Sequence, residues 1–193
     1  MSPKEVLDLP LNVRKDPEAR RPVVGQCIKP RWRCWRQLSS KAGRWAKEGV
    51  RLPWRQVPMP RKLPQKDLCS EEQHHIDVAV EDMLQAGAVY ENTAKNLVLS
   101  PIYTVPKKEK GKRRLVINLR WVNSHLRTEH FKMTTMKEIK GMIRKDAFMA
   151  KIDLKDCYWQ VPVYQKDQRF LSFRWKGKNY TFRSLPFGLS VSP

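Results

Sequence analysis

The run Ala150-Lys151-Ile152-Asp153-Leu154-Lys155-Asp156-Cys157-Tyr158-Trp159-Gln160-Val161-Pro162 decides the fold predicted for this chain. Apolar residues between positions 148 and 152 lead up to Asp153, which predicts a buried strand that ends at this aspartate. A carboxylate at the end of such a strand can reach a metal ion without being buried unpaired. The run therefore predicts a Mg²⁺ ligand at Asp153 and phosphoryl transfer as the chemistry.

Three other blocks stand around this run. Two precede it, Ser100-Pro101-Ile102-Tyr103-Thr104-Val105-Pro106-Lys107-Lys108 and Arg114-Leu115-Val116-Ile117-Asn118-Leu119-Arg120-Trp121-Val122-Asn123, and one follows it, Leu185-Pro186-Phe187-Gly188-Leu189-Ser190-Val191-Ser192-Pro193. In content, order and spacing, the four blocks resemble the fingers and palm of retroelement reverse transcriptases over residues 97–193. The residues of these blocks look closest to those of LTR-type elements, and among them to those of the DIRS-like group.

This resemblance implies an α+β fold: the fingers and partial palm of a right-hand polymerase, built from β-hairpins and packing helices. The implied activity is RNA-directed DNA polymerisation, in which a primer 3′-hydroxyl attacks a nucleoside triphosphate. Such polymerases hold two divalent cations, expected here to be Mg²⁺, between carboxylates. The implied partners are an RNA or DNA template-primer and deoxynucleoside triphosphates.

The resemblance also assigns roles in the first run. Asp153 would bind both metal ions, and Leu154 matches the residue that follows the catalytic aspartate. The main-chain amides of Asp156 and Cys157 match those that hold triphosphate oxygens. Tyr158 takes the position of the steric gate, whose ring leaves no room for a ribose 2′-hydroxyl; a tyrosine in such a turn could otherwise be plain core. The Asp156 carboxylate could share a cation with Asp153, but in the family it points away from the metals.

Two strands, at about 98–105 and 114–119, are predicted on either side of the cationic turn 107–112. The resemblance implies that this hairpin closes over the incoming nucleotide. Arg114 and either Lys107 or Lys108 would then grip the triphosphate, because a guanidinium fork and a mobile ammonium both suit phosphate oxygens. Without the flanking motifs, a basic turn of this kind would be interpreted as a solvated loop.

A second hairpin is predicted from alternating apolar and polar residues at 169–175 and 180–183, around Lys176-Gly177-Lys178-Asn179. Phe187 and Gly188 follow it. The resemblance places these two residues under the base and sugar of the nucleotide, where a glycine lets backbone approach a ligand closely.

Two helices are predicted. Ser70 and Gln73 form a capping pattern that starts a helix ending near Gly87. A second helix over about 134–144 has an apolar face that should pack the palm from behind; its members are Met136, Ile139, Met142 and Ile143.

The charge is strongly positive, with 39 Lys and Arg against 19 Asp and Glu, so a polyanion should be attracted in a salt-dependent way. Residues 1–66 hold 17 of the basic residues and five of the acidic ones, together with nine of the 14 prolines and four of the seven tryptophans. The chain therefore divides into a basic Pro/Trp-rich region, 1–66, and a reverse transcriptase-like region, 67–193.

The basic region has two interpretations. Lys29-Pro30-Arg31-Trp32-Arg33-Cys34-Trp35-Arg36 interleaves aromatic and cationic side chains that can stack on bases and neutralise phosphates. Alternatively, its apolar residues cover a helix pair packed on the fingers, and this reading is favoured. Those residues are Trp35, Leu38, Trp45, Val50 and Leu52.

No apolar run approaches the length of a membrane span, and the N-terminus lacks a signal-peptide core, so an intracellular setting in cytoplasm or nucleus and no membrane partner are expected. Cys27, Cys34, Cys69 and Cys157 show no paired spacing, which favours reduced thiols. A zinc site that joins the first three to a histidine is disfavoured, because the short CxxC-type steps are missing.

The sequence stops at Pro193, before the paired aspartates, thumb and RNase H segments expected downstream. The first functional hypothesis is therefore a reverse transcriptase fragment that is active only within a longer protein. The second is a non-catalytic element remnant that binds nucleic acid non-specifically. A basic RNA-binding protein of ribosomal type is disfavoured, because it gives no reason for Asp153, Tyr158 and Phe187-Gly188 to occur in this order.

Overall fold

The computed structural model describes residues 24–107, 111, 113–127, 133–145, 148, 150, 154 and 156–191. Its α-helices are α1 (Trp32–Leu38), α2 (Ser40–Glu48), α3 (Ser70–Gln85), α4 (Arg120–Asn123) and α5 (Met136–Met142). The 3₁₀ turns are η1 (Lys29–Arg31), η2 (Cys157–Gln160) and η3 (Gln165–Phe170). The strands are β1 (Arg61–Lys62), β2 (Val89–Glu91), β3 (Val98–Leu99), β4 (Ile102–Pro106), β5 (Arg113–Ile117), β6 (Ser172–Trp175) and β7 (Lys178–Phe182).

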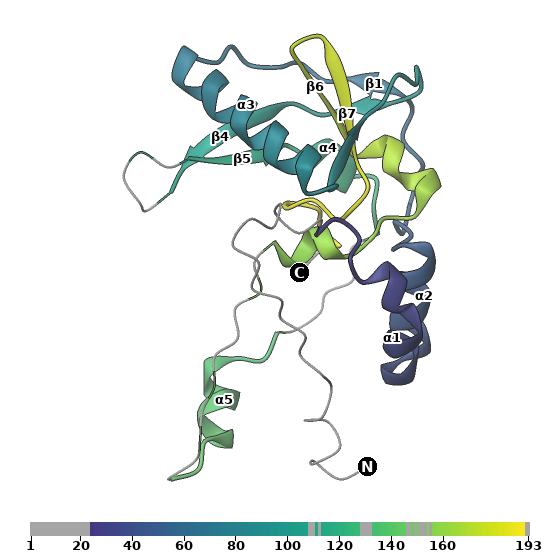
Figure 1. Cartoon of the computed structure of the whole chain (residues 1–193), viewed down its shortest axis with the longest axis vertical. Coiled ribbons are helices and arrows are strands. Elements are labelled where there is room, and N and C mark those ends of the chain that lie inside the picture. The colour runs from purple at the N-terminus through teal and green to yellow at the C-terminus, as the bar shows by residue number, and fades with distance from the viewer. Residues whose placement is uncertain are drawn as a thin grey trace.

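The fold is mixed α+β. One sheet has the strand order β1-β3-β6-β7-β2, and β4 and β5 form a separate two-stranded hairpin. The long helix α3 packs against β2, β4 and β5 (Figure 1). Its Ile76, Val80 and Met83 are buried in the same core as Phe173, which is fully buried on β6 and stacks on Tyr180 of β7.

The second hairpin is confirmed, with a shorter turn than predicted. Trp175 pairs with Lys178, so only Lys176 and Gly177 lie between the strands. Both have positive φ, of 43° and 81°, the conformation of the tight hairpin turn that matches strand twist. The expected start at 169 is wrong because residues up to Phe170 belong to η3.

The first predicted strand is two strands. β3 joins the large sheet, where Leu99 pairs with Ser172, and the chain then crosses at Ser100-Pro101 into β4. A proline cannot donate to a strand ladder, which suits this crossing point. The strands on either side of 107–112 pair as predicted, up to Pro106 and Arg113; residues 108–110 and 112 lie outside the described residues. β5 ends at Ile117, before the predicted 119, because Leu119 caps α4.

The predicted cap of α3 is off by one residue. Cys69 is the N-cap, and the Glu72 carboxylate three residues later accepts a hydrogen bond from the Cys69 N–H, at 3.2 Å. Ser70 is instead the first helical residue. The end is as predicted, because α3 stops at Gln85 and Gly87 follows with φ of 68°.

Helix α5 forms, with Thr135 as its cap, but its expected packing is wrong. The predicted face points to solvent, since Met136, Ile139, Met142 and Ile143 are all exposed. No other element packs closely against this helix among the described residues, so nothing covers the face.

The buried strand expected before Asp153 is also not seen in the described part of the run. Phe148, Ala150 and Leu154 are exposed and lie outside any strand. These side chains therefore lack the burial that the apolar run predicted. Asp153 itself lies outside the described residues.

The expected helix pair of the basic region exists, but only its C-terminal end packs as expected. Leu52 is buried in the core and Val50 packs against it. Trp35, Leu38 and Trp45 are exposed, because α1 and α2 pack mainly on each other and on η1. In Figure 1 the two helices lie side by side and apart from the sheet.

Candidate functional site

Tyr158 and Phe187 come together from segments that the sequence separates widely. Tyr158 lies in η2, and Phe187 follows β7 at the end of the large sheet. Their ring centroids are 4.8 Å apart in an edge-to-face arrangement, with an interplanar angle of 80°. The Tyr158 ring is half-buried and packs against the core, whereas Phe187 is exposed. The two predicted nucleotide residues thus form one aromatic pair.

Gly188 is held by a residue that was not predicted. Asn123, the last residue of α4, donates its side-chain N–H to the Gly188 carbonyl (2.9 Å) and accepts from the Ser190 N–H (3.0 Å). Gly188 has φ of 89°, which an L side chain rarely adopts. A Cβ there would meet only the Ile117 carbonyl, at 3.8 Å. Glycine is therefore required by conformation rather than by space.

The backbone before Tyr158 is turned by a left-handed residue. Asp156 has φ of 51°, and its carbonyl accepts from the Trp159 N–H at 3.0 Å. Aspartate tolerates this conformation better than most residues. Asp156 and Cys157 are half-buried, and Leu154 is exposed two residues earlier. Asp156 and Cys157 therefore directly precede the aromatic pair.

The two neighbouring arginines of β5 have opposite environments. Arg113 lies on the face that meets α3, and its guanidinium contacts Glu72 (3.1 Å) and Thr104 (2.7 Å). Arg114 is on the other face, opposite Val105, with an exposed side chain. Lys107 is exposed at the start of the turn, while Lys108 lies outside the described residues.

Arg114 lies away from the aromatic pair along the strand. Arg114 is three positions before Ile117, whose carbonyl lies 3.8 Å from where a Cβ on Gly188 would be. This is about 10 Å of strand. A ligand that contacted both ends would have to be several ångströms long, as a nucleoside triphosphate is.

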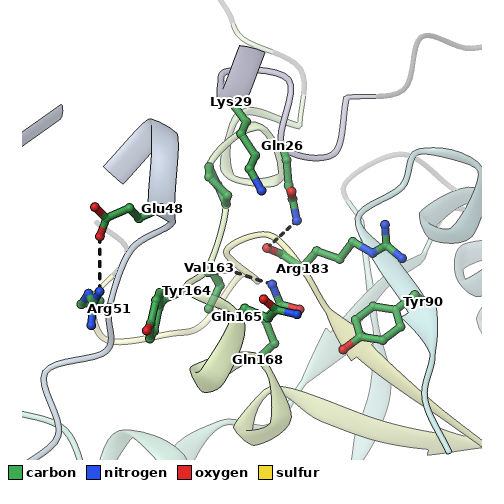
Figure 2. Close-up of a pocket in the computed structure, with 11 residues that line it drawn as sticks. Gln26, Lys29, Glu48, Arg51, Tyr90, Val163, Tyr164, Gln165, Gln168 and Arg183 are labelled. Atoms are coloured by element: carbon green, nitrogen blue, oxygen red, sulfur yellow. Dashed lines mark hydrogen bonds and ion pairs between the residues drawn. The ribbon is translucent and has the colours of Figure 1, made fainter. Parts of the chain in front are cut away.

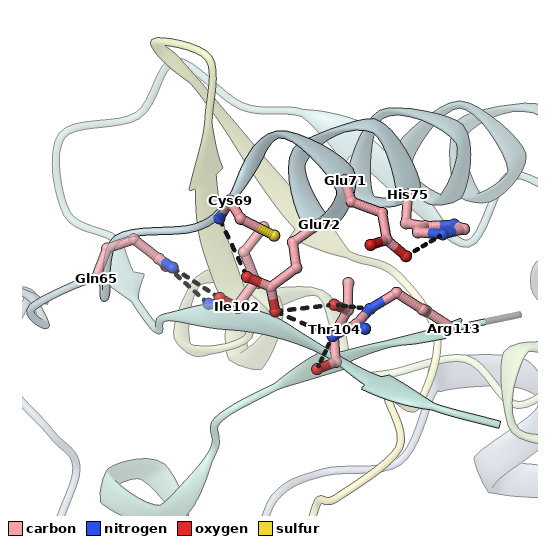
Figure 3. A network of polar contacts seen from close by, with 8 residues as sticks. All are labelled: Gln65, Cys69, Glu71, Glu72, His75, Ile102, Thr104 and Arg113. Atoms are coloured by element: carbon pink, nitrogen blue, oxygen red, sulfur yellow. Dashed lines mark hydrogen bonds and ion pairs between the residues drawn. The ribbon is translucent and has the colours of Figure 1, made fainter. Parts of the chain in front are cut away.

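Glu72 fixes the half of this hairpin nearer its turn to α3 (Figure 3). One of its carboxylate oxygens contacts Arg113 and Thr104, and the other accepts from the Cys69 N–H. This backbone hydrogen bond is the main cause that lowers the pKa of Glu72 below its ordinary value; the side chains of Cys69 and Thr104 and the charge of Arg113 add to it, and burial opposes it.

Replacement of Glu72 with glutamine should remove a pH-dependent part of the stability. Because the folded-state pKa is lowered, this stability is present above the ordinary pKa of about 4.3 and is lost as pH falls through the folded value. Urea unfolding of the wild type and Glu72→Gln, from pH 6 down to pH 3, should therefore give stabilities that converge in acid.

Glu71→Gln is the matched control, because Glu71 is exposed in the same helical turn, and its one ion pair within the described part of the chain is with His75, at 3.8 Å. Its stability difference from the wild type should stay nearly constant over this range. Equal convergence for both variants would contradict the role given to the Glu72 contacts.

No group of three or more His, Cys, Asp or Glu side chains forms a candidate metal site within the described residues. Cys27, Cys34 and Cys69 are exposed free thiols, and Cys157 is a half-buried one. No described helix is long and apolar enough to cross a membrane.

The part of the chain that contains β5, η2 and the segment after β7 is similar to known proteins. The family model described as "Reverse transcriptase (RNA-dependent DNA polymerase)" matches residues 105–193. This part of the chain is a partial reverse transcriptase domain. The Transposon Tf2-7 and Tf2-3 polyproteins of Schizosaccharomyces pombe are each 27% identical to the chain over 146 residues, which is 76% of the chain. The chain spans 10% of the length of these polyproteins.

Solved structures share the fold of this reverse transcriptase fragment. The foamy viral protease-reverse transcriptase in complex with double-stranded DNA superimposes with a TM-score of 0.52 and 27% identity, covering 69% of this chain and 22% of that one. The native prototype foamy virus protein gives a TM-score of 0.62 at 24% identity, covering 76% and 19%. A further foamy viral structure contains an RNA/DNA hybrid, with a TM-score of 0.57 and 23% identity, covering 74% and 19%.

Two structural residues of the fragment had no sequence signal strong enough to find them. Asn123 ends one of the blocks that resemble the family, but no role for its side chain follows from the sequence. Asp167 is a single aspartate in η3, and its carboxylate accepts from the Leu52 N–H (2.9 Å) and the Trp54 indole N–H (3.0 Å). Both act between segments far apart in the sequence, so no local pattern indicates them.

Proposed function

We propose that residues 67–193 are the fingers and the beginning of the palm of an RNA-directed DNA polymerase, and that residues 1–66 are a basic extension. The polymerase would act as part of a longer polyprotein. The observation that carries this proposal is the contact of Tyr158 with Phe187, beside a Gly188 fixed by Asn123. The DIRS-like character remains a proposal at the level of sequence motifs.

The described residues would act by placing the nucleotide. Arg114, free of the Glu72 network that holds Arg113, would contact the triphosphate together with Lys107 or Lys108. The main-chain amides of Asp156 and Cys157 and the backbone at Leu154 would lie along the triphosphate. Phe187 and Gly188 would lie under the base and sugar.

Asp153 would hold the divalent metal ions, for which Mg²⁺ is proposed. When bound, such ions activate the 3′-hydroxyl and neutralise the leaving group. The described residues alone do not form this site, because they contain no cluster of metal ligands. Further carboxylates from the rest of the polyprotein would have to complete it.

Tyr158→Ala should let the polymerase accept ribonucleotides, because the ring that excludes a 2′-hydroxyl is lost. The preference for deoxynucleotides, measured as the ratio of kcat/KM values for dNTP and rNTP, should fall on the order of tenfold or more. Tyr158→Phe keeps the ring and its edge contact with Phe187, so it should retain the preference. Unchanged sugar selection in the alanine variant would rule out the gate assignment.

The function itself is tested by primer extension on an RNA template with Mg²⁺. The 193-residue chain is compared with a form extended through the downstream coding sequence of its element. Extension by the longer form alone is expected. Activity of the short chain would mean that another carboxylate, such as Asp156, completes the metal site.

The second candidate function, a remnant that binds nucleic acid without catalysis, is favoured by the charge of +20 alone. It would be supported if both forms failed to extend a primer while salt-sensitive binding of nucleic acid remained. Stop codons in place of the paired-aspartate motif would support it independently.

A further inference from the structure

The helices α1 and α2 leave tryptophans exposed where folding does not require it. Trp35 is 37% exposed and Trp45 39%, although both lie on helices that have a partner to pack against. Large aromatic side chains normally bury most of their surface, and exposed ones mark binding sites when they occur together. Leu38, at the end of α1, is more exposed still.

Cations lie over two tryptophan rings of these helices, Trp32 and Trp45. Residues 29–51, which we call the basic arm, contain eight basic residues and one acidic residue. Arg33 and Lys47 lie over Trp32, with Nζ of Lys47 at 4.8 Å from the ring centroid. The Lys41 Nζ lies 4.7 Å over the Trp45 ring. A polyanion with flat, apolar bases matches this mixture in both charge and shape.

The two helices of the basic arm pack closely on each other, but no other described helix or strand packs extensively over them. A Cβ on Gly43 would lie 2.5 Å from the Arg36 Cβ, so the two helices touch closely at this glycine. Beyond each other and η1, neither helix packs extensively on another described element. The arm thus presents its outer surface to solvent, beside the sheet rather than on it (Figure 1).

A polar cavity of about 620 Å³ continues this surface at the base of the arm. Its cations come from three segments: Lys29 from η1, Arg51 from the end of the arm and Arg183 from the end of β7 (Figure 2). The Arg51 guanidinium forms an ion pair with the Glu48 carboxylate, at 3.3 Å, and its Cζ lies 3.9 Å from the centroid of the Tyr164 ring. Arg183 lies 4.7 Å over Tyr90, and neither it nor Lys29 is paired with a carboxylate among the described residues.

We propose that the basic arm and this cavity bind single-stranded nucleic acid: bases stack on the exposed tryptophans, and phosphates follow the cations into the cavity. This surface lies outside residues 105–193, apart from the cavity wall, and involves neither Tyr158 nor Phe187. A single strand is favoured over a duplex because only unpaired bases expose faces for stacking.

The test is binding of the whole 193-residue chain to labelled 20-nucleotide single-stranded RNA, by fluorescence anisotropy across a salt series in EDTA. Without a primer or a divalent metal, the result does not depend on polymerase activity. Arg33→Gln/Lys41→Gln/Arg44→Gln should weaken binding and lower the slope of log K against log salt by up to about 2. Lys95→Gln/Lys140→Gln/Arg174→Gln removes the same charge from exposed sites elsewhere and should leave the slope unchanged.

The stacking of bases on the exposed tryptophans is tested with Trp35→Ala/Trp45→Ala, which should weaken binding of the single-stranded RNA by about tenfold or more. Trp35→Phe/Trp45→Phe retains rings and should recover most of the affinity, which separates stacking from a loss of folding. Lys29→Gln/Arg183→Gln tests the cavity and should also weaken binding. The same binding measurement is made with single-stranded DNA and duplex RNA of the same length.

Equal binding of single-stranded RNA and DNA would identify the phosphodiester strand itself as the ligand, and a preference would identify which of the two the arm takes. Equal losses in the arm and control charge variants would overturn the proposal, as would stronger binding of the duplex. Full affinity in the tryptophan-to-alanine variant would remove the stacking role, and full affinity in the cavity variant would remove the cavity from the path.

Discussion

Replacement of Asp153 with alanine should abolish primer extension by a polymerase that contains this chain, while template-primer binding stays largely intact. A metal ligand in phosphoryl transfer stabilises charge that develops only in the transition state, so its loss lowers kcat rather than affinity. We expect a loss of at least about a thousandfold, which corresponds to roughly 4 kcal/mol. Single-turnover extension and a filter-binding measurement on the same preparation separate the two effects.

Asp156→Asn is the matched control for this variant. It removes a carboxylate three residues away, and asparagine tolerates the left-handed backbone that Asp156 adopts. Extension should therefore be reduced far less than by Asp153→Ala. The reverse order of effects would make Asp156 the metal ligand, and loss of template-primer binding in Asp153→Ala would make Asp153 a structural residue.

Replacement of Asp167 with alanine should produce the largest loss of stability among the polar contacts described. The buried carboxylate accepts from the Leu52 N–H and from the Trp54 indole, each with a different oxygen. Alanine leaves both donors without this partner, the Leu52 N–H in a buried position and the Trp54 indole N–H in a half-buried one. The expected cost is about 2–4 kcal/mol in the free energy of unfolding, measured by urea denaturation.

Asp167→Asn should lower the free energy of unfolding by less than Asp167→Ala. The amide keeps one acceptor oxygen for one of the two donors, although its N–H₂ group then faces the other. Asp67→Ala, at an exposed aspartate, is the control and should stay within about 0.5 kcal/mol of the wild type. A similarly small change for Asp167→Ala would mean that the segment around Leu52 is held by apolar packing alone.

Local patterns predicted the elements that depend on nearby residues. The cationic turn at 107–112, the hairpin at Lys176-Gly177 and the end of α3 at Gly87 all follow from residues within a few positions of each other. The similarity of residues 105–193 to reverse transcriptases was predicted from the order of the motifs around Asp153, Tyr158 and Phe187-Gly188. Their roles toward a nucleotide remain predictions.

The predictions that were wrong or incomplete concern residues whose environment depends on partners distant in the sequence. The apolar face of α5 predicted burial, yet periodicity states only that a face is apolar and not that anything covers it. The break between β3 and β4 is visible only once Leu99 is paired with Ser172. The different environments of Arg113 and Arg114 likewise depend on Glu72, 41 residues before Arg113.

The contact of Leu52 with Asp167 joins residues 115 positions apart, and Val50 pairs with Val163 in the same region. On a ribosome that adds about 5–20 residues per second, the partner of Leu52 is made roughly 6–23 s later. The segment after the basic arm therefore cannot reach its final place early in synthesis. Closure of so long a loop is intrinsically slow, so this particular tether forms only after most of the chain has been made.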